Sequence, residues 1–103
     1  MTSATQPHPR HGVDEQLTAP IRLSIMAALS RVDEVDFQTL RDAIEISDSA
    51  LSKQAAVLES AGYVELRKGY VGKRPRTWVS VTPAGRAALA AHLAALRAIV
   101  DEL

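Results

Sequence analysis

The pattern of apolar and polar positions divides the chain into three parts. Apolar residues recur every three or four positions over 13–29 and 39–62, which predicts helices with one buried face. The period then becomes two, and residues 63–68 and 76–81 alternate as the strands of an antiparallel hairpin do. The helical period returns after Thr82 and continues to the C-terminus. The expected fold class is therefore α+β, mainly α.

The stretch over 39–64 is predicted to be a helix-turn-helix. Ser47 is placed to cap its second helix, and Gly62 to end it, because a left-handed backbone costs glycine little. The exposed side of this second helix begins with small polar side chains, which suit a helix that lies in a DNA groove and hydrogen-bonds base edges. An ordinary helical hairpin with a solvated face is the alternative for this stretch taken alone. The candidate DNA-binding residues here are Ser47, Asp48, Ser49, Ser52, Lys53 and Gln54.

The first and last helices are predicted to form a dimer surface. Thr18 is the expected N-cap of the first helix, and Pro20 fits its first turn. This helix is apolar on two sides, so one side can face the core and the other a partner. In the last helix, apolar residues are spaced 4, 3, 4, 3, as in the seam of a coiled coil, and His92 beside the seam is assigned a packing or surface role. The candidate dimerisation residues are Leu17, Leu23, Met26, Leu89, Leu93, Leu96, Val100 and Leu103.

The charged residues are distributed unevenly, although the formal net charge is zero. Residues 1–65 carry ten acidic and five basic side chains, whereas 66–103 carry two acidic and seven basic ones. A basic half of this kind is a candidate surface for a polyanion. A seven-residue loop between the two strands is expected to bring Lys73 and Arg74, together with Arg76, to phosphates or into a minor groove. The alternative is a sheet edge that charge protects against aggregation.

The remaining composition argues against several classes of protein. A chain of 103 residues without cysteine forms one modest core and no disulfide or thiolate zinc site. His8 and His11 have no third ligand nearby, so no metal and no cofactor is predicted. Neither a glycine-rich phosphate loop nor a catalytic triad is found, which argues against an enzyme. No apolar run is long enough to cross a membrane, and the start of the chain lacks the apolar core of a signal peptide, so a cytoplasmic location is expected.

Three short runs carry a resemblance to a known family. ISDSALSK and LESAGYV open and close the second helix of the pair, and GKRPRTWVSVTPAG spans the second strand and the start of the last helix. Together with APIRLSIMAAL in the first helix, they resemble the winged helix-turn-helix regulators of the MarR and ArsR type over roughly residues 17–103. The resemblance makes Arg74 the wing arginine. Gly72 stands where MarR-type wings usually carry an aspartate, and the cysteines of the metal-sensing ArsR members are absent.

Pattern and resemblance together divide the chain into a disordered tail over 1–12, a winged helix DNA-binding domain over 13–82 and a C-terminal dimerisation helix over 83–103. The resemblance implies a homodimeric, sequence-specific transcriptional regulator, in the first place a repressor, that binds a pseudo-palindromic operator in double-stranded DNA. Related regulators bind small-molecule effectors at the dimer interface, but no residue here identifies one. The alternative from a different class is a winged helix used as a protein–protein interaction module.

Overall fold

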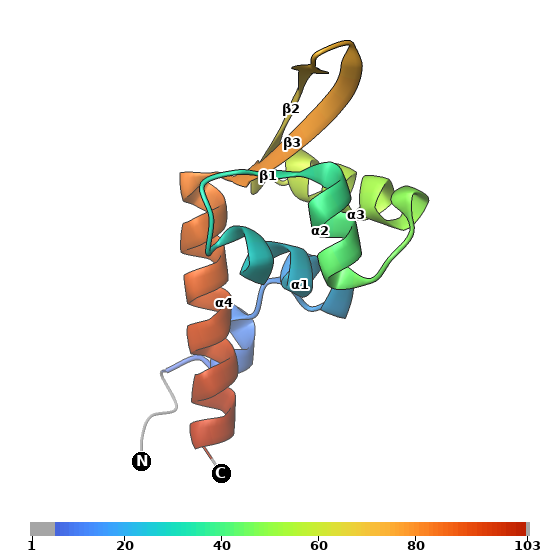
Figure 1. Ribbon diagram of the computed structural model, residues 1–103. Helices are drawn as coiled ribbons and strands as arrows, with labels where there is room; N and C mark the ends of the chain where they lie inside the picture. The colour runs from blue at the N-terminus through green and yellow to red at the C-terminus, as the bar shows by residue number, and fades with distance from the viewer. Residues whose placement is uncertain (1–5, 103) are drawn as a thin grey trace.

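The computed structural model describes residues 6–102 and consists of three short helices, a three-stranded antiparallel sheet and a long C-terminal helix (Figure 1). The sheet order is β1-β3-β2, and β2 and β3 extend beyond the helices as a hairpin, away from the far end of α4 (Figure 1). The predicted α+β, mainly helical class is confirmed. The elements in chain order are the 3-10 helices η1 (Pro9–Gly12) and η2 (Glu15–Leu17), then α1 (Pro20–Leu29), β1 (Val35–Asp36), α2 (Phe37–Ile44), α3 (Asp48–Ser60), β2 (Val64–Val71), β3 (Arg74–Val81) and α4 (Pro83–Asp101).

Local capping fixes the turn between α2 and α3. Asp36 precedes α2, and its carboxylate accepts the backbone N–H of Thr39 at 2.7 Å. α2 ends where Glu45 takes a left-handed backbone conformation, with φ at 62°. Ser47 then caps α3, as predicted, by accepting the backbone N–H of Ala50 at 3.1 Å. Because a cap of this kind contributes about 1 kcal/mol, the sequence determines where both helices begin.

The apolar core lies between the short helices, the sheet and the first half of α4. Leu51 and Leu58 bury the inner face of α3, and Leu40 buries the facing side of α2. Each fully buried leucine contributes about 1.5–3 kcal/mol, and truncating one to alanine costs about 2–5 kcal/mol. The inner face therefore holds α3 in place and leaves its outer face available for other contacts. The core consists of Leu17, Ile25, Met26, Leu29, Leu40, Leu51, Leu58, Val64, Val79 and Leu89.

The hairpin has longer strands and a tighter turn than the sequence suggested. β2 and β3 pair along their whole length and leave only Gly72 and Lys73 between them, so the predicted seven-residue loop is wrong. Gly72 takes the positive φ (62°) that a two-residue hairpin turn needs at its first central position. Gly69 leaves room for the ring of Trp78, which a Cβ would approach to 3.0 Å. Pro75 lies beyond the two positions at which β3 pairs with β1, on a free edge that tolerates its missing N–H.

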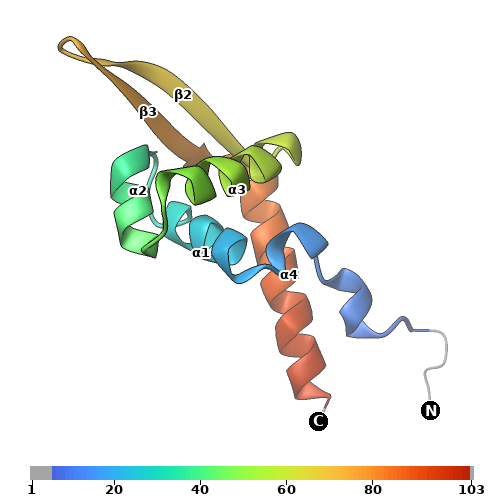
Figure 2. The ribbon, with the colours of Figure 1, turned by 90° about the vertical axis from the view of Figure 1, so that its right-hand side faces the viewer.

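The N-terminal segment contains a short helix where a disordered tail was predicted. η1 lies against α4, so the prediction of disorder over 1–12 is wrong for the residues of η1 (Figure 2). The side chain of His8 caps this turn by accepting the backbone N–H of Arg10 at 3.0 Å. Pro9 favours this helix, because its ring presets the backbone angle φ of the first helical residue. Residues 1–5 lie outside the described part of the chain.

Thr82 caps α4, whereas the cap predicted for α1 is wrong. Thr82 Oγ1 accepts the backbone N–H of Gly85 at 2.9 Å, and a proline follows at the first helical position. α1 begins at Pro20, but Thr18 is not its cap, because the Thr18 hydroxyl donates to the carbonyl of Glu15 at 3.0 Å. The helices within residues 6–102 are all too short or too polar to cross a membrane.

Several predicted dimerisation residues belong to the core of the single chain. Leu17 and Met26 are fully buried and Leu89 is 7% exposed, so their assignment to a dimer surface is wrong. Leu23 is half-buried against the same core. The spacing of the apolar residues could not distinguish the two roles. The face of a helix that packs on its own core repeats with the same period as a coiled-coil seam. Among the other candidates, Leu93 and Val100 are 48% and 64% exposed, Leu96 is half-buried and Leu103 lies outside the described residues.

Candidate nucleic-acid interface

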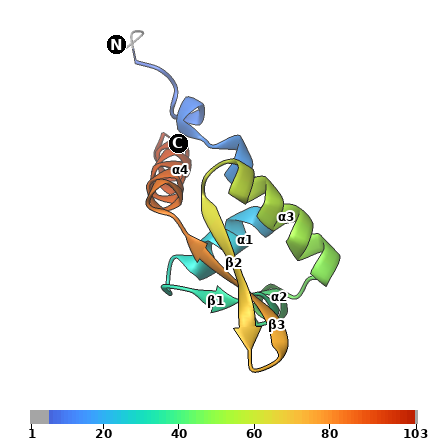
Figure 3. The same cartoon turned by 90° about the horizontal axis from the view of Figure 1, so that it is seen from above.

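The outer face of α3 is exposed next to the base of the hairpin. Figure 3 shows α3 beside the hairpin when the molecule is viewed from above. Ser49, Ser52 and Lys53 are exposed on this helix. Ser52 and Lys53 make no hydrogen bond or ion pair with another described residue, whereas the hydroxyl of Ser49 lies 3.2 Å from that of Ser47. The N-terminal half of α3 therefore presents free hydroxyl and ammonium groups to solvent.

Asp48, the acidic residue at the start of α3, is paired with an arginine of α2. Arg41 Nη1 lies 2.8 Å from Asp48 Oδ1, and Arg41 Nε lies 2.9 Å from Asp42 Oδ1. The hydrogen bonds to Asp42 and Asp48 raise the pKa of Arg41 above its ordinary value. Asp48 is thus no uncompensated negative charge at the exposed face, and one of its oxygens has no contact with Arg41. Arg41 could not be predicted from the pattern, because an ion pair between residues seven positions apart across a turn has no regular spacing.

Two other predicted residues of α3 are engaged within the chain. The hydroxyl of Ser47 accepts the N–H that caps the helix. Gln54 is half-buried, and its Oε1 accepts a hydrogen bond from Arg22 Nη1 at 2.8 Å. This bond holds the Gln54 amide toward α1, so Ser49, Ser52 and Lys53 are the predicted residues that remain most accessible.

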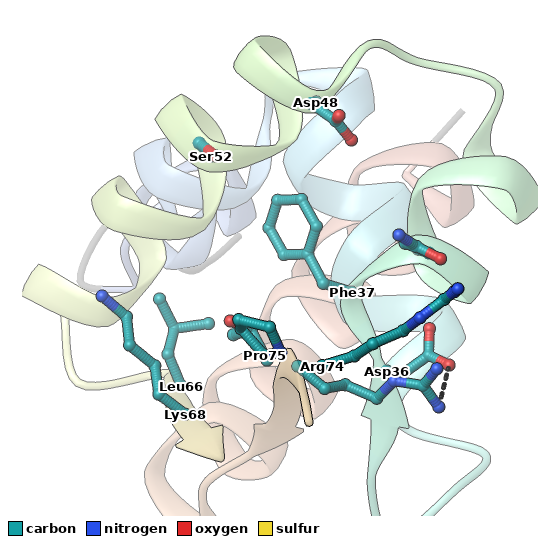
Figure 4. A pocket seen from close by; sticks show the side chains of 11 residues that line it. Asp36, Phe37, Asp48, Ser52, Leu66, Lys68, Arg74 and Pro75 are labelled. Atoms are coloured by element: carbon teal, nitrogen blue, oxygen red, sulfur yellow. Dashed lines mark ion pairs between the residues drawn. The ribbon is translucent and has the colours of Figure 1, made fainter. Parts of the chain in front are cut away.

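A groove of about 530 Å³ separates α3 from the hairpin. Figure 4 shows Phe37 in the middle of this groove, with Asp48 and Ser52 on the side of α3 and Pro75 and Arg74 on the side of β3. The groove brings together two predicted residues of α3, Asp48 and Ser52, and two predicted residues of the wing, Arg74 and Arg76, which are more than 20 positions apart in the chain. The other predicted residues do not line it: Ser47, Ser49, Lys53, Gln54 and Lys73. Its lining residues are Asp36, Phe37, Gln38, Asp48, Ser52, Leu66, Lys68, Arg74, Pro75, Arg76 and Thr77.

The basic residues of the hairpin fall into two sets. Arg67 is compensated, because its guanidinium donates to both oxygens of Glu34 at 2.8 and 3.1 Å and lies 4.1 Å from the centre of the Trp78 ring. The hydrogen bond from Arg67 lowers the pKa of Glu34. Arg76 has a looser ion pair with Asp36, at 3.9 Å.

The second set is the free cations, which we define as Lys68, Lys73 and Arg74. All three are exposed, and none is paired with an acidic side chain of residues 6–102. Lys68 was not among the predicted contacts. Its signal was available, because residues two positions apart in a strand share a face, so Lys68 lies on the same side of β2 as Leu66, and both line the groove. The outer half of the hairpin therefore carries an unneutralised positive charge beside the groove.

Comparison with known proteins identifies the fold. The family of winged helix DNA-binding domains matches residues 21–100. The chain belongs to this family. A transcriptional regulator homologue from Pyrococcus horikoshii OT3 is 29% identical to this chain and superimposes on it with a TM-score of 0.80. The match covers 86% of this chain and 88% of the homologue. A MarR family transcriptional regulator from Silicibacter pomeroyi is 26% identical over 91% of this chain and 65% of its own, with a TM-score of 0.62.

The winged-helix fold of this protein is that of MarR- and ArsR-type transcriptional regulators, as the sequence resemblance implied. A MarR family regulator from Streptomyces coelicolor, solved in complex with DNA, shares this fold with a TM-score of 0.65 and 23% identity over 92% of this chain and 66% of its own. In winged-helix terms, α3 stands in the position of the recognition helix and β2–β3 in that of the wing.

Proposed function

We propose that this winged-helix protein is a sequence-specific DNA-binding repressor of transcription that acts as a homodimer on a pseudo-palindromic operator. The observation that carries the proposal is the single surface formed by the exposed start of α3, the groove and the free cations of the wing. A surface with exposed serine hydroxyls on a helix and free cations on the neighbouring wing matches duplex DNA, whose base edges lie between two phosphate backbones.

The dimensions of the elements fit the grooves of B-DNA. An α-helix with side chains is about 10–12 Å wide, and the major groove is about 12 Å wide. With α3 in the major groove, Ser49, Ser52 and Lys53 reach base edges, and the free oxygen of Asp48 can accept from a cytosine amino group. The wing then lies over the flanking backbone, where Lys73 and Arg74 bind phosphates or enter the minor groove.

The homodimer is supported by the outer half of α4. Leu93 and Val100 are exposed on one side of this helix, with Leu96 half-buried beside them. Apolar side chains exposed together favour a partner, and a second copy of the same helix offers a matching surface. Two-fold symmetry would place the recognition helices in successive major grooves, with half-sites about one helical turn, or 34–36 Å, apart. An operator bound in this way within a promoter would be closed to RNA polymerase.

Binding to duplex DNA at several salt concentrations tests the proposal. The probes are the DNA upstream of the protein's own gene, a scrambled duplex of equal length, and duplexes selected from a random pool. We expect a preference of about 10³-fold or more for one sequence over the scrambled duplex, and affinity that falls steeply as salt rises. Equal, weak binding to all duplexes would refute the sequence-specific function, and no binding at low salt would favour the protein-interaction alternative.

A matched pair of arginine variants tests which surface binds. Arg74→Ala removes a free cation of the wing, whereas Arg10→Ala removes an exposed arginine of η1, which lies against α4 and not beside the wing. Each phosphate contact contributes about 0.9 to the slope of log K against log salt, so Arg74→Ala in both subunits should reduce the slope by about 2. Arg10→Ala should leave it unchanged. Equal effects of the two variants would show that the wing is not the phosphate-binding surface.

A further inference from the structure

We infer that Asp14 is a positioning residue that fixes the direction of α4 relative to the recognition helix α3. In a dimer joined through α4, this direction sets the separation of the two recognition helices. The inference rests on the proposed function for its consequence at DNA, but its structural part can be tested without DNA. It is carried by contacts among Asp14, Tyr63 and His92, three residues from separate parts of the chain that the DNA-binding surface does not use.

The first attachment of α4 to α3 is made by backbone contacts. Tyr63 follows the end of α3, and its carbonyl accepts the backbone N–H of Thr82 at 3.0 Å. Thr82 Oγ1 also donates to the carbonyl of Gly62 at 2.6 Å. Gly85, in the first turn of α4, lies so close that a Cβ there would be 2.2 Å from the Tyr63 oxygen. These contacts, with Arg86 Nη1 on the carbonyl of Ser30 at 3.0 Å and Leu89 in the core, hold the first two turns of α4. Contacts further along the helix are needed to fix the direction of its far end.

The second attachment is made through Asp14. The hydroxyl of Tyr63 donates to the Asp14 carboxylate, and the backbone N–H of Asp14 donates to Nδ1 of His92 at 3.0 Å. His92 is only 1% exposed, and Nδ1 can accept this bond only when that nitrogen carries no proton. His92 lies seven residues after Gly85, about 10 Å further along the axis of α4. Two attachments at this separation determine the direction of the helix.

The segment around Asp14 is itself held in place, so it can transmit a constraint. Leu17 is fully buried in the core. Asp14 Oδ1 accepts the backbone N–H of Gln16 at 2.8 Å. Arg22 donates through Nε to the carbonyl of Gln16 at 2.6 Å and through Nη1 to Gln54 of α3 at 2.8 Å. The segment is therefore joined to α3 through Arg22 of α1 and to α4 through His92, and Figure 2 shows it next to α4.

A small change in the direction of α4 has a large effect at DNA. A 19-residue helix is about 28 Å long, so a swing of about 10° moves its far end by about 5 Å. The rise of one base pair is about 3.4 Å. Loss of the second attachment should therefore allow the two recognition helices to sample separations that differ by more than one base pair.

Two substitutions break the second attachment from opposite ends. Tyr63→Phe removes the hydroxyl that donates to Asp14 and keeps the ring. His92→Leu removes the acceptor and leaves the Asp14 N–H without a partner, whereas His92→Asn places a side-chain oxygen at the same distance from the backbone as Nδ1. His11→Leu is the matched control, because His11 is exposed and its side chain makes no polar contact with another described residue.

The first measurement is an intrachain distance in the absence of DNA. The chain has no cysteine, so spin labels can be attached at Ala56→Cys on α3 and Asp101→Cys at the end of α4, both exposed positions. Dilution with unlabelled protein removes distances between subunits. We expect one narrow distance distribution in the wild type, His92→Asn and His11→Leu, and a broader one in Tyr63→Phe and His92→Leu. Unchanged distributions in the last two would overturn the inference.

The second measurement compares a duplex with two half-sites and a duplex with one, for each variant. Tyr63→Phe and His92→Leu should bind the two-half-site duplex about tenfold more weakly, the equivalent of one lost hydrogen bond. They should bind the single half-site within about twofold of the wild type and discriminate less between duplexes whose half-sites are one base pair closer or further apart. Equal losses on both duplexes would overturn the inference. A wild type without preference for two half-sites would instead refute the proposed function, and the spin-label distances would still decide the role of Asp14.

Discussion

Gly85→Ala tests how closely α4 is packed against the end of the recognition helix. A Cβ at this position would lie 2.2 Å from the Tyr63 carbonyl oxygen and 2.9 Å from its carbonyl carbon and from Val81 Cγ2. The backbone of Tyr63 or the first turn of α4 must therefore move. Overpacking of this kind costs about 1–3 kcal/mol, and weakening the Thr82 cap adds about 1 kcal/mol. Alanine is favoured over glycine within a helix by about 0.5–1 kcal/mol. The expected net loss is about 1–3.5 kcal/mol, with a central value near 2 kcal/mol.

Urea unfolding of Gly85→Ala, followed by circular dichroism, measures this loss directly. Thermal unfolding gives a second measurement. At about 4–8 °C for each kcal/mol of lost stability, the melting temperature should fall by about 10–20 °C. Gly62→Ala is the comparison, because no atom lies within 4 Å of its Cβ and only its positive φ of 81° opposes alanine, at a cost of about 1–2 kcal/mol. If Gly85→Ala is as stable as the wild type, or less destabilised than Gly62→Ala, the close approach of α4 to Tyr63 is wrong.

Three further outcomes follow from other parts of the structure. Ser52→Ala should change which operator sequence is preferred, as measured by selection from a random pool, and leave the salt dependence intact. Asp36→Ala should cost about 1 kcal/mol at pH 7. The N–H that Asp36 accepts at the start of α2 lowers its pKa, so its contribution is present above the ordinary aspartate pKa and is lost as pH falls through the lowered value. Unfolding free energies of the variant and the wild type should therefore converge as pH falls well below the ordinary aspartate pKa, and a constant difference would refute this reasoning. Leu93→Asp should give monomers by sedimentation, while Ala91→Asp, on the opposite side of α4, should not; two dimers would exclude this face as the interface.

Features that depend on residues close together in the sequence, such as helix caps, could be predicted. Features that depend on contacts between distant residues, such as strand pairing, could not. The caps at Ser47 and Thr82 and the end of α3 before Gly62 are set by the residues themselves, so the helix boundaries of the recognition unit follow from the pattern. Gly72 and the proline after Arg74 suggested a loop, because the same residue types serve loops, tight turns and free strand edges. Only the pairing of β2 with β3 distinguishes these uses.

The predicted site was incomplete for a similar reason. Exposed cations such as Arg74 can be found from charge alone, but the state of each charge depends on its partner. Asp48 is compensated by Arg41, and Arg67 by Glu34, which lies 33 positions earlier in the chain. The dimer prediction failed at Leu89 for the same reason. The spacing of Leu89 from the other apolar residues of α4 fits a coiled-coil seam, but its burial places it in the core.

Three exposed polar side chains of α3 also have a consequence for how this protein can diverge. Ser49, Ser52 and Lys53 are exposed, while the stability of the helix depends on its opposite face. Substitutions at exposed positions of this kind usually change stability by no more than about 0.5 kcal/mol. If these residues read the operator, a duplicated gene could acquire a new target sequence by single substitutions. Its phosphate contacts, its fold and its dimer would be inherited unchanged.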